Sequence, residues 1–140
     1  MAVELQRLGY TALCALDISD GMLNEAKKKN VYKKFICAAL TDQEIPEIQT
    51  GEFDALICGG AMFKGHIHSS ALTEMVRIVK TCGLLCFNIR DSRADDFKGK
   101  ILELENVGIW ENACKKMVPY FDRDELPSET SAFVYKILMK

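Results

Sequence analysis

Short apolar runs alternate along the chain with segments in which polar and apolar residues follow a helical spacing. The run Ala12–Leu16 passes without alternation into a single carboxylate, Asp17. An uninterrupted run of this length predicts a strand that is buried on both faces of a parallel sheet. The same pattern predicts three further strands, at Phe35–Leu40, Phe53–Cys58 and Leu84–Arg90.

The segments between these runs have apolar residues three and four positions apart, which predicts helices. They cover approximately residues 2–8, 20–30, 70–79 and 96–107. The second of them has a cap candidate in Ser19 or Asp20 and carries Lys27–Lys29 at its carboxyl end, in accord with the helix dipole. Residues 41–52 hold a proline and a glycine among polar residues and predict a loop.

The last part of the chain has a different pattern. Polar and apolar residues alternate in Ile109–Val118 and in Ala132–Met139, which predicts an antiparallel pair of half-exposed strands. Strands that alternate with helices indicate the α/β class. No linker rich in Gly, Ser or Pro interrupts the pattern, so residues 1–140 are predicted to form a single domain.

The composition indicates which classes of binding partner and which cellular compartment to expect. The formal net charge of −2 offers no basic footprint for nucleic acid or for an anionic membrane, so a small molecule or a protein is the expected partner. No apolar run approaches the roughly 18 residues that cross a bilayer. Six cysteines without a C-x-x-C pair point to an intracellular protein, in the cytoplasm with the nucleus as the alternative. Four of them, Cys14, Cys37, Cys58 and Cys86, lie in apolar runs and are expected in the core.

Candidate chemistry gathers at the ends of the predicted strands. Asp17 stands at a carboxyl strand end, where open α/β sheets bind ligands, although such a carboxylate can also simply cap the next helix. Gly59 and Gly60 end the third predicted strand, where they either let a ligand approach the backbone or form a plain loop. His66 and His68 have no third ligand nearby, so a solvated loop is expected there and no metal.

The order of these features resembles the class I S-adenosylmethionine-dependent methyltransferases. The resemblance runs from about Leu8 to Lys140 and rests on the strand that ends in Asp17, on Phe53-Asp54 and on Lys80-x-x-Gly83 before the fourth strand. It implies a three-layer α/β fold with a mostly parallel, Rossmann-like sheet and a C-terminal antiparallel strand pair. Cys82 replaces a glycine of the family's usual turn.

The resemblance also implies a cofactor, S-adenosylmethionine, and positions that hold it. Asp17 would accept hydrogen bonds from the two ribose hydroxyls, since a carboxylate offers two acceptor oxygens to a vicinal diol. Ile18 would pack on the adenine, and Met22 would close that side. The remaining implied contacts are Ala39 and Leu40, or Thr41 and Asp42, at the adenine amino group, and Gly59 and Gly60 facing the sulfonium and the methyl acceptor.

One family element has no counterpart in this sequence. The family's first strand and its turn, Asp/Glu-x-Gly-x-Gly-x-Gly, do not occur among the 140 residues. We therefore expect a methyltransferase domain shortened at its amino terminus, with the first strand missing and two strands left with an unpaired edge. Two other functions are possible interpretations of the sequence. The first is a non-catalytic interaction or regulatory form that self-associates through these edges, and the second is a nicotinamide-dependent oxidoreductase. The second is disfavoured because G-x-G-x-x-G is absent.

Overall fold

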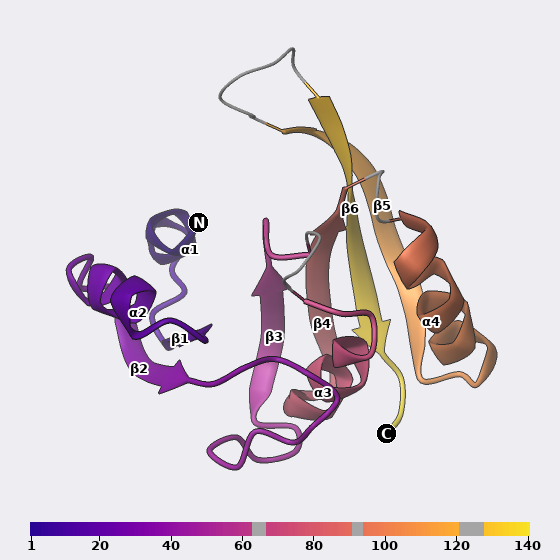
Figure 1. The fold of residues 1–140 in the computed structure, drawn as a ribbon, viewed down its shortest axis with the longest axis horizontal. Coiled ribbons are helices and arrows are strands. Elements are labelled where there is room, and N and C mark those ends of the chain that lie inside the picture. Colours follow the sequence, from indigo (N-terminus) through magenta and orange to yellow (C-terminus); the bar gives the residue numbers. More distant parts are fainter. Residues whose placement is uncertain (63–66, 91–93, 121–127) are drawn as a thin grey trace. The chain divides into compact units, whose positions relative to one another are not determined.

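The computed structural model describes residues 1–62, 67–90, 94–120 and 128–140, with no side-chain description for residues 120, 128 and 129. The chain divides into two compact units, Met1–Leu40 and Thr41–Lys140, here called the amino-terminal and the carboxy-terminal unit. Both combine helices and strands, which confirms the predicted α/β class (Figure 1). That all 140 residues form a single domain stays a prediction.

The amino-terminal unit holds two helices and a parallel strand pair. Its elements are α1 (Ala2–Arg7), β1 (Leu13–Asp17), α2 (Asp20–Lys27) and β2 (Tyr32–Cys37). The predicted start of α2 is confirmed, because the Ser19 hydroxyl accepts a hydrogen bond from the Met22 amide at 3.3 Å and caps the helix, whereas its end lies at Lys27 instead of about residue 30. Gly9 follows α1 with a φ of 97°, a conformation that suits glycine and ends the helix.

Two details of this unit differ from the sequence prediction. The second strand lies three residues earlier than predicted and ends at Cys37 instead of Leu40. Its register explains the shift, since Cys37 pairs with Asp17, the last residue of β1, and β1 offers no later partner. All five residues of β1 are half-buried rather than buried, because the described residues give this strand a neighbour on one side only.

The carboxy-terminal unit is built on a four-stranded sheet in the order β3-β4-β6-β5. β3 pairs with β4 in parallel, whereas β6 runs antiparallel to both β4 and β5 (Figure 1). The predicted antiparallel ending is thus confirmed. The elements are β3 (Phe53–Cys58), α3 (Ala71–Ile78), β4 (Val79–Ile89), α4 (Ala94–Asn106), β5 (Trp110–Tyr120) and β6 (Ser128–Ile137).

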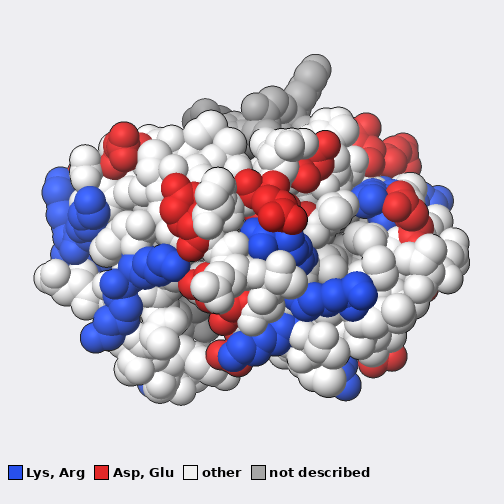
Figure 2. Space-filling view, turned by 90° about the horizontal axis from the view of Figure 1, so that it is seen from below, with Lys and Arg blue, Asp and Glu red and all other residues white. Residues whose placement is uncertain are grey.

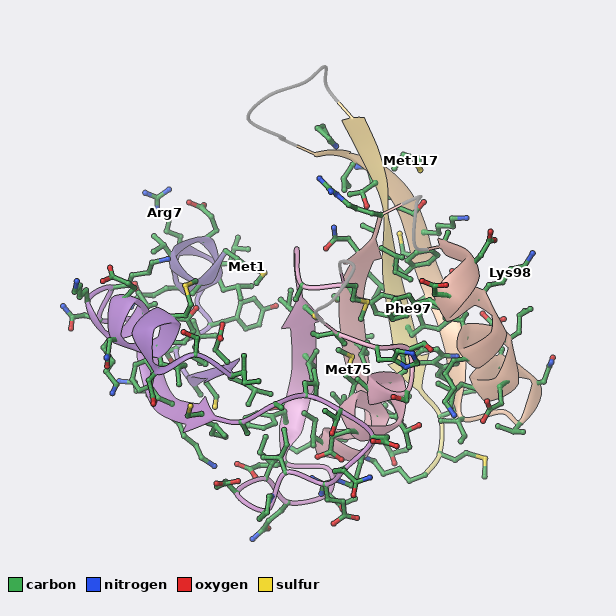
Figure 3. All side chains as sticks on the ribbon, viewed as in Figure 1. Met1, Arg7, Met75, Phe97, Lys98 and Met117 are labelled. Carbon is green, nitrogen blue, oxygen red and sulfur yellow. The ribbon has the colours of Figure 1, made fainter. Side chains whose placement is uncertain are left out.

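Aromatic side chains form the centre of this unit's core. The rings of Trp110 and Tyr135 stack with centroids 4.1 Å apart, and Phe87 stacks on Tyr135 at 5.8 Å. α4 contributes the fully buried Phe97 (Figure 3) and Glu105, whose carboxylate accepts a hydrogen bond from the Tyr135 hydroxyl at 3.0 Å. Burial raises the pKa of Tyr135 to about 12. Each buried polar tip therefore has a partner, and the cluster joins three strands to α4.

A buried ion pair fastens the predicted loop, residues 41–52, to α3. Glu74 is 2% exposed, and its carboxylate accepts hydrogen bonds from the Arg77 side chain and from the Ile45 amide. Arg77 in turn donates to the carbonyls of Ile45 and Ile48 and to the Thr50 hydroxyl. The sequence pattern indicated a loop here but no fixed conformation. The ion pair fixes the conformation of the loop, because Glu74 and Arg77 both also form hydrogen bonds with backbone atoms of the loop.

α3 ends one residue earlier than predicted. Val79 is already extended and opens β4. The Lys140 ammonium lies at this helix end and donates to the carbonyls of Val76, Arg77 and Val79. A cation suits the negative end of the helix dipole, and these carbonyls have no partner inside the helix. Lys140 therefore works as a side-chain cap supplied from a distant part of the chain.

The start of β4 contains an irregular turn next to β3. The register shifts between Phe53 and Ala55, so that Lys80–Gly83 bulges beside Asp54. The Lys80 ammonium donates to the Asp54 carboxylate at 2.7 Å and lowers the pKa of Asp54. Cys82 has a φ of 66°, in the left-handed region that non-glycine residues rarely adopt. This geometry explains why a glycine would fit position 82 better.

Replacing Cys82 with glycine is therefore expected to stabilise the fold by about 1 kcal/mol, since the left-handed conformation costs a side-chain-bearing residue 1–2 kcal/mol and glycine very little. The measurement is urea unfolding of the two proteins. Cys82→Ala is the control, because it removes the thiol and keeps the strained Cβ, and its stability should equal that of the parent. A glycine variant no more stable than the alanine variant contradicts the explanation.

Of the four cysteines that were expected in the core, one is buried, two are half-buried and one is exposed. Cys58 is buried and Cys14 and Cys86 are half-buried, but Cys37 is exposed, so it is not a core residue as predicted. Its place at the end of a strand with a single neighbour explains the exposure.

Of the helices in the described parts of the chain, none is long and apolar enough to cross a membrane.

Candidate functional site

The first group of predicted site residues surrounds the carboxyl end of β1. Asp17 is the last residue of that strand, and its Oδ1 accepts a hydrogen bond from the Ser19 amide at 2.8 Å. The carboxylate thus shapes the turn that leads into α2, while Ser19 itself caps the helix. Within the described residues, no protein donor is assigned to Oδ2. One carboxylate oxygen holds the turn, and the other is available to a ligand.

Two apolar side chains near Asp17 are strongly exposed. Ile18 follows it directly and is 72% exposed, and Met22, in the first turn of α2, is 60% exposed. Large apolar side chains gain free energy, about 25 cal/mol per Å², when a ligand covers them. A flat, weakly polar ring is a suitable cover for both. Ile18 follows the strand end directly, and the Met22 amide binds the Ser19 hydroxyl, so both residues belong to the turn that Asp17 shapes. Their role toward a cofactor stays a prediction.

The segment after β2 lies against the same strand end. The Ala38 amide donates to the Asp17 carbonyl at 3.1 Å, and the Cys37 thiol donates to the Ile18 carbonyl at 3.5 Å. Ala39 is exposed and Leu40 half-buried. These hydrogen bonds bring Cys37 and Ala38 to the end of β1. A contact of Ala39 and Leu40 with a cofactor stays a prediction.

Cys37 is a member of this group that the sequence did not indicate. A hydrogen bond with the Asp20 side chain, the partial loss of hydration and the charges of Asp20 and Asp17 raise the pKa of its thiol. The thiol is therefore protonated at neutral pH and acts as a donor instead of a nucleophile. Only the register, in which Cys37 pairs with Asp17, could have revealed it.

The second group lies in the carboxy-terminal unit, at the carboxyl ends of β3 and β4. Gly59 and Gly60 are exposed and directly follow β3. Gly60 has a φ of 70°, and its amide donates to the Asn88 side-chain oxygen at 2.8 Å. The turn is thus fixed by the neighbouring parallel strand. Asn88 was missed in the sequence, although an amide side chain near the end of an apolar strand was a visible signal.

The remaining candidates add little chemistry. Cys58 precedes the glycine pair, and burial raises the pKa of its thiol to about 11, so it is no nucleophile at neutral pH. His68 accepts a weak hydrogen bond from the Ser70 amide at 3.4 Å, and His66 lies outside the described residues. In the described ranges, no three His, Cys, Asp or Glu residues are grouped so that they could hold a metal ion.

The seven predicted positions thus fall into two groups, each at the carboxyl ends of parallel strands. Asp17, Ile18, Met22, Ala39 and Leu40 belong to the amino-terminal unit, and Gly59 and Gly60 to the carboxy-terminal unit. The first group combines a carboxylate, exposed apolar side chains and the backbone segment after β2, which begins at the end of β1. This donor and acceptor set suits a nucleoside, in which a diol and a flat base are joined.

Known proteins match the chain in sequence and in fold. Residues 1–87 match the family model of the methyltransferase domain. The human Methyltransferase-like protein 27 is 30% identical over 116 residues, which make up 79% of this chain and 46% of that protein. The chain therefore spans about half the length of this curated relative.

Two solved structures show the likeness in fold. A SAM-dependent methyltransferase from Methanosarcina mazei matches with a TM-score of 0.70 over 100% of this chain and 88% of its own, at 11% identity. A candidate methyltransferase from Streptococcus mutans, in complex with SAH, matches with a TM-score of 0.55 over 91% of this chain and 76% of its own, at 13% identity. At such identities a structural likeness shows the fold alone. The family model, by contrast, covers more than half of the sequence, and on that ground the chain belongs to the methyltransferase domain family.

Proposed function

We propose that this chain serves S-adenosylmethionine-dependent methyl transfer to a small-molecule or protein acceptor, and that the end of β1 holds the adenosine half of the cofactor. The observation that carries the proposal is the Asp17 carboxylate, with one oxygen engaged by the Ser19 amide and the exposed Ile18 and Met22 nearby. Membership of the methyltransferase family supports the reaction class.

The residues present suit an adenosine group. Asp17 Oδ2 can accept from a ribose hydroxyl, and Oδ1 can share its second lone pair with the other hydroxyl. Ile18 and Met22 can cover the adenine, and backbone groups at Ala39 and Leu40 can meet its amino group. Gly59 and Gly60 belong to the other unit, and their role at the sulfonium end stays a prediction. The SAH bound by the Streptococcus mutans protein supports this choice of ligand.

Methyl transfer from this cofactor requires no strong general base from the protein. When bound, the cofactor supplies a methyl group that is already activated for displacement. The chain has to bind the cofactor, align the methyl acceptor with it and keep water out of the site.

The charge of the surface bears on the acceptor. On the face shown in Figure 2, Lys and Arg side chains are interspersed with Asp and Glu side chains, and this mixture favours a small molecule or a protein as acceptor over nucleic acid. Within the family we propose kinship with the methyltransferase-like protein of the Williams-Beuren syndrome critical region, and a cytoplasmic location.

The second candidate function is a non-catalytic interaction or regulatory form of the same scaffold. The strand pairing favours it, because among the described residues β1 pairs only with β2, and β3 pairs only with β4. In addition, the 140 residues contain no Asp/Glu-x-Gly-x-Gly-x-Gly turn for the methionine half of the cofactor. This form would bind S-adenosylmethionine weakly or not at all and would act through its strand edges.

Calorimetric titration with S-adenosylhomocysteine distinguishes the two functions. We expect the purified chain to bind it and Asp17→Ala to lose at least about tenfold in affinity, because hydrogen bonds to a charged group contribute roughly 1.5–3 kcal/mol. Asp17→Asn tests the charge alone, since its Oδ1 can still accept from the Ser19 amide.

The matched control is Ser19→Ala, which removes the helix cap of α2 but leaves the carboxylate in place. It should bind as tightly as the parent. Equal binding by the parent and by Asp17→Ala contradicts the assignment of Asp17. No binding by a parent chain whose circular dichroism shows a folded α/β protein contradicts activity of this chain and favours the interaction form.

A further inference from the structure

Lysine side chains gather where α2 ends and β2 begins. Between Glu25 and Asp42 the sequence holds five lysines and no acidic residue. A short loop joins the helix end to the start of the strand, so these lysines lie at one corner of the amino-terminal unit (Figure 1). Four of these exposed lysines form what is here called the lysine cluster, Lys27, Lys28, Lys29 and Lys33.

The pleat of β2 and one ring contact bring members of the cluster to the same side. Lys33 and Phe35 are two positions apart, so their side chains lie on the same face of the strand. The Lys27 ammonium lies over the Phe35 ring, 5.4 Å from its centre, which places the end of α2 above this face. The fifth lysine, Lys34, belongs to the opposite face and is not a member of the cluster.

The cluster has few counter-ions within the described ranges. Lys28 pairs with Glu25 at 2.6 Å, but both side chains are at least 65% exposed, and such a pair contributes little. Neither Lys29 nor Lys33 forms an ion pair with a described residue. The helix dipole accounts for a cation at the end of α2, but Lys33 is not in that helix. Like charges at one corner repel each other, so a bound anion would stabilise them.

The rest of the chain has the opposite charge. Outside this stretch, 13 basic residues stand against 20 acidic ones, a net charge of −7. We propose that the lysine cluster binds an acidic segment of a partner protein. The carboxylates of such a segment pair with the ammonium groups at the surface, where neither partner has to give up all of its water. The cluster needs water or anions around it in any case, because lysines are almost never buried without a counter-ion.

Charge and residue type favour an acidic peptide over other polyanions. A nucleic acid carries a charge at every phosphate, so the net charge of −7 elsewhere would repel the parts of a strand that extend beyond the cluster. The cluster also offers no open ring for base stacking, since Phe35 is half-buried and lies beneath Lys27. An anionic membrane is disfavoured because residues 26–34 expose no large apolar side chain that could enter it.

The cluster and the candidate cofactor residues lie at opposite ends of the strand pair. β1 and β2 are parallel, and Asp17 pairs with Cys37 at their carboxyl ends, whereas Lys33 is the second residue of β2. Four residues of extended strand separate Lys33 from Cys37, about 13 Å. An acidic segment on the cluster should therefore leave the affinity for S-adenosylhomocysteine unchanged. The inference does not rest on the proposed function, and the two can fail separately.

Titration of the full chain with hexaglutamate, followed by the NMR shifts of its backbone amides, tests the proposal. At low salt the amides of residues 27–33 should shift, and the affinity should fall as salt is added. Lys29→Glu combined with Lys33→Glu turns two attractions into repulsions and should weaken binding at least about tenfold. The matched control is Lys98→Glu combined with Lys116→Glu, the same change of charge at two exposed lysines of the carboxy-terminal unit, which should bind like the parent.

The proposal is overturned if hexaglutamate shifts none of these amides at low salt, or if both double variants weaken binding equally. It is also overturned if a single-stranded oligonucleotide with the same number of charges, or a vesicle containing phosphatidylserine, binds the cluster more tightly than the peptide does. Lys29→Gln combined with Lys33→Gln is the second variant, for use if the charge-reversed chain has an altered circular dichroism spectrum. It removes the same two ammonium groups and should also weaken the binding of hexaglutamate.

Discussion

Gly83→Ala is expected to destabilise the carboxy-terminal unit by about 3 kcal/mol or more. A Cβ at this position would lie 2.6 Å from the Asp54 carbonyl oxygen, 2.6 Å from a Val79 methyl carbon and 2.8 Å from the Lys80 carbonyl oxygen. Two of these three neighbours are backbone atoms and cannot turn aside. The clash would force β3 and β4 apart at the bulge Lys80–Gly83, where their register shifts. Urea unfolding followed by the fluorescence of Trp110, the sole tryptophan, measures the loss.

Gly99→Ala is the matched control for this substitution. Gly99 lies in α4, and a Cβ there meets nothing within 4 Å. The same chemical change should therefore stabilise the protein by about 0.5–1 kcal/mol, because alanine loses less conformational entropy in a helix than glycine does. A loss of stability in both variants, or in neither, would contradict the role assigned to the close contacts of Gly83.

Glu74→Ala should have the second large effect, a loss of about 3–5 kcal/mol. It removes the acceptor of the Ile45 amide and leaves Arg77, whose side chain is 15% exposed, without its counter-ion. In the parent, the hydrogen bond to Glu74 raises the pKa of Arg77 further. In the variant the guanidinium still keeps its proton at neutral pH, because the pKa of arginine is intrinsically high, so it cannot escape the penalty by becoming neutral. Thermal or urea unfolding gives the magnitude, and limited proteolysis within residues 41–52 reports the loss of the tether.

The chain offers a matched exposed pair with the same residue types and the same spacing. Arg7 donates to Glu4 at 2.9 Å in α1, and both side chains are at least 66% exposed. Glu4→Ala should therefore cost about 0.5 kcal/mol or less, because water screens the pair and competes for it. If the Glu74 and Glu4 variants lose similar amounts, burial is not what gives the Glu74–Arg77 pair its effect.

Elements set by local sequence were predictable. The apolar run that ends at Asp17 and the cap at Ser19 each specify structure within a few residues, and the strand end and the helix start lie where they were predicted. The end of β2 was predicted wrongly, because the apolar residues after Cys37 continue the pattern while the pairing with β1 stops. A strand's extent depends on its neighbour, which a single sequence does not show.

Contacts between distant residues were beyond the sequence pattern. The hydrogen bond from the Gly60 amide to Asn88 spans 28 residues, and that from the Ile45 amide to Glu74 spans 29. Both join groups that look ordinary in the sequence, an amide near a strand end and a glutamate in a helix. At the candidate site, the strand pattern indicated Asp17 and the family resemblance indicated Ile18 and Met22, but their roles toward a cofactor stay predictions. The Cys37 thiol became visible only through the strand register.

The position of β6 has a consequence for biosynthesis. β6 lies in the sheet between β4 and β5, both of which leave the ribosome before it. Until residues 128–137 emerge, β4 has no neighbour on that side, and the buried faces of Leu85, Phe87 and Ile89 lack their partners. β5 likewise pairs with no other strand than β6 among the described residues. The sheet can therefore be completed only after β6 has been synthesised, and until then the nascent chain exposes apolar surface of β4.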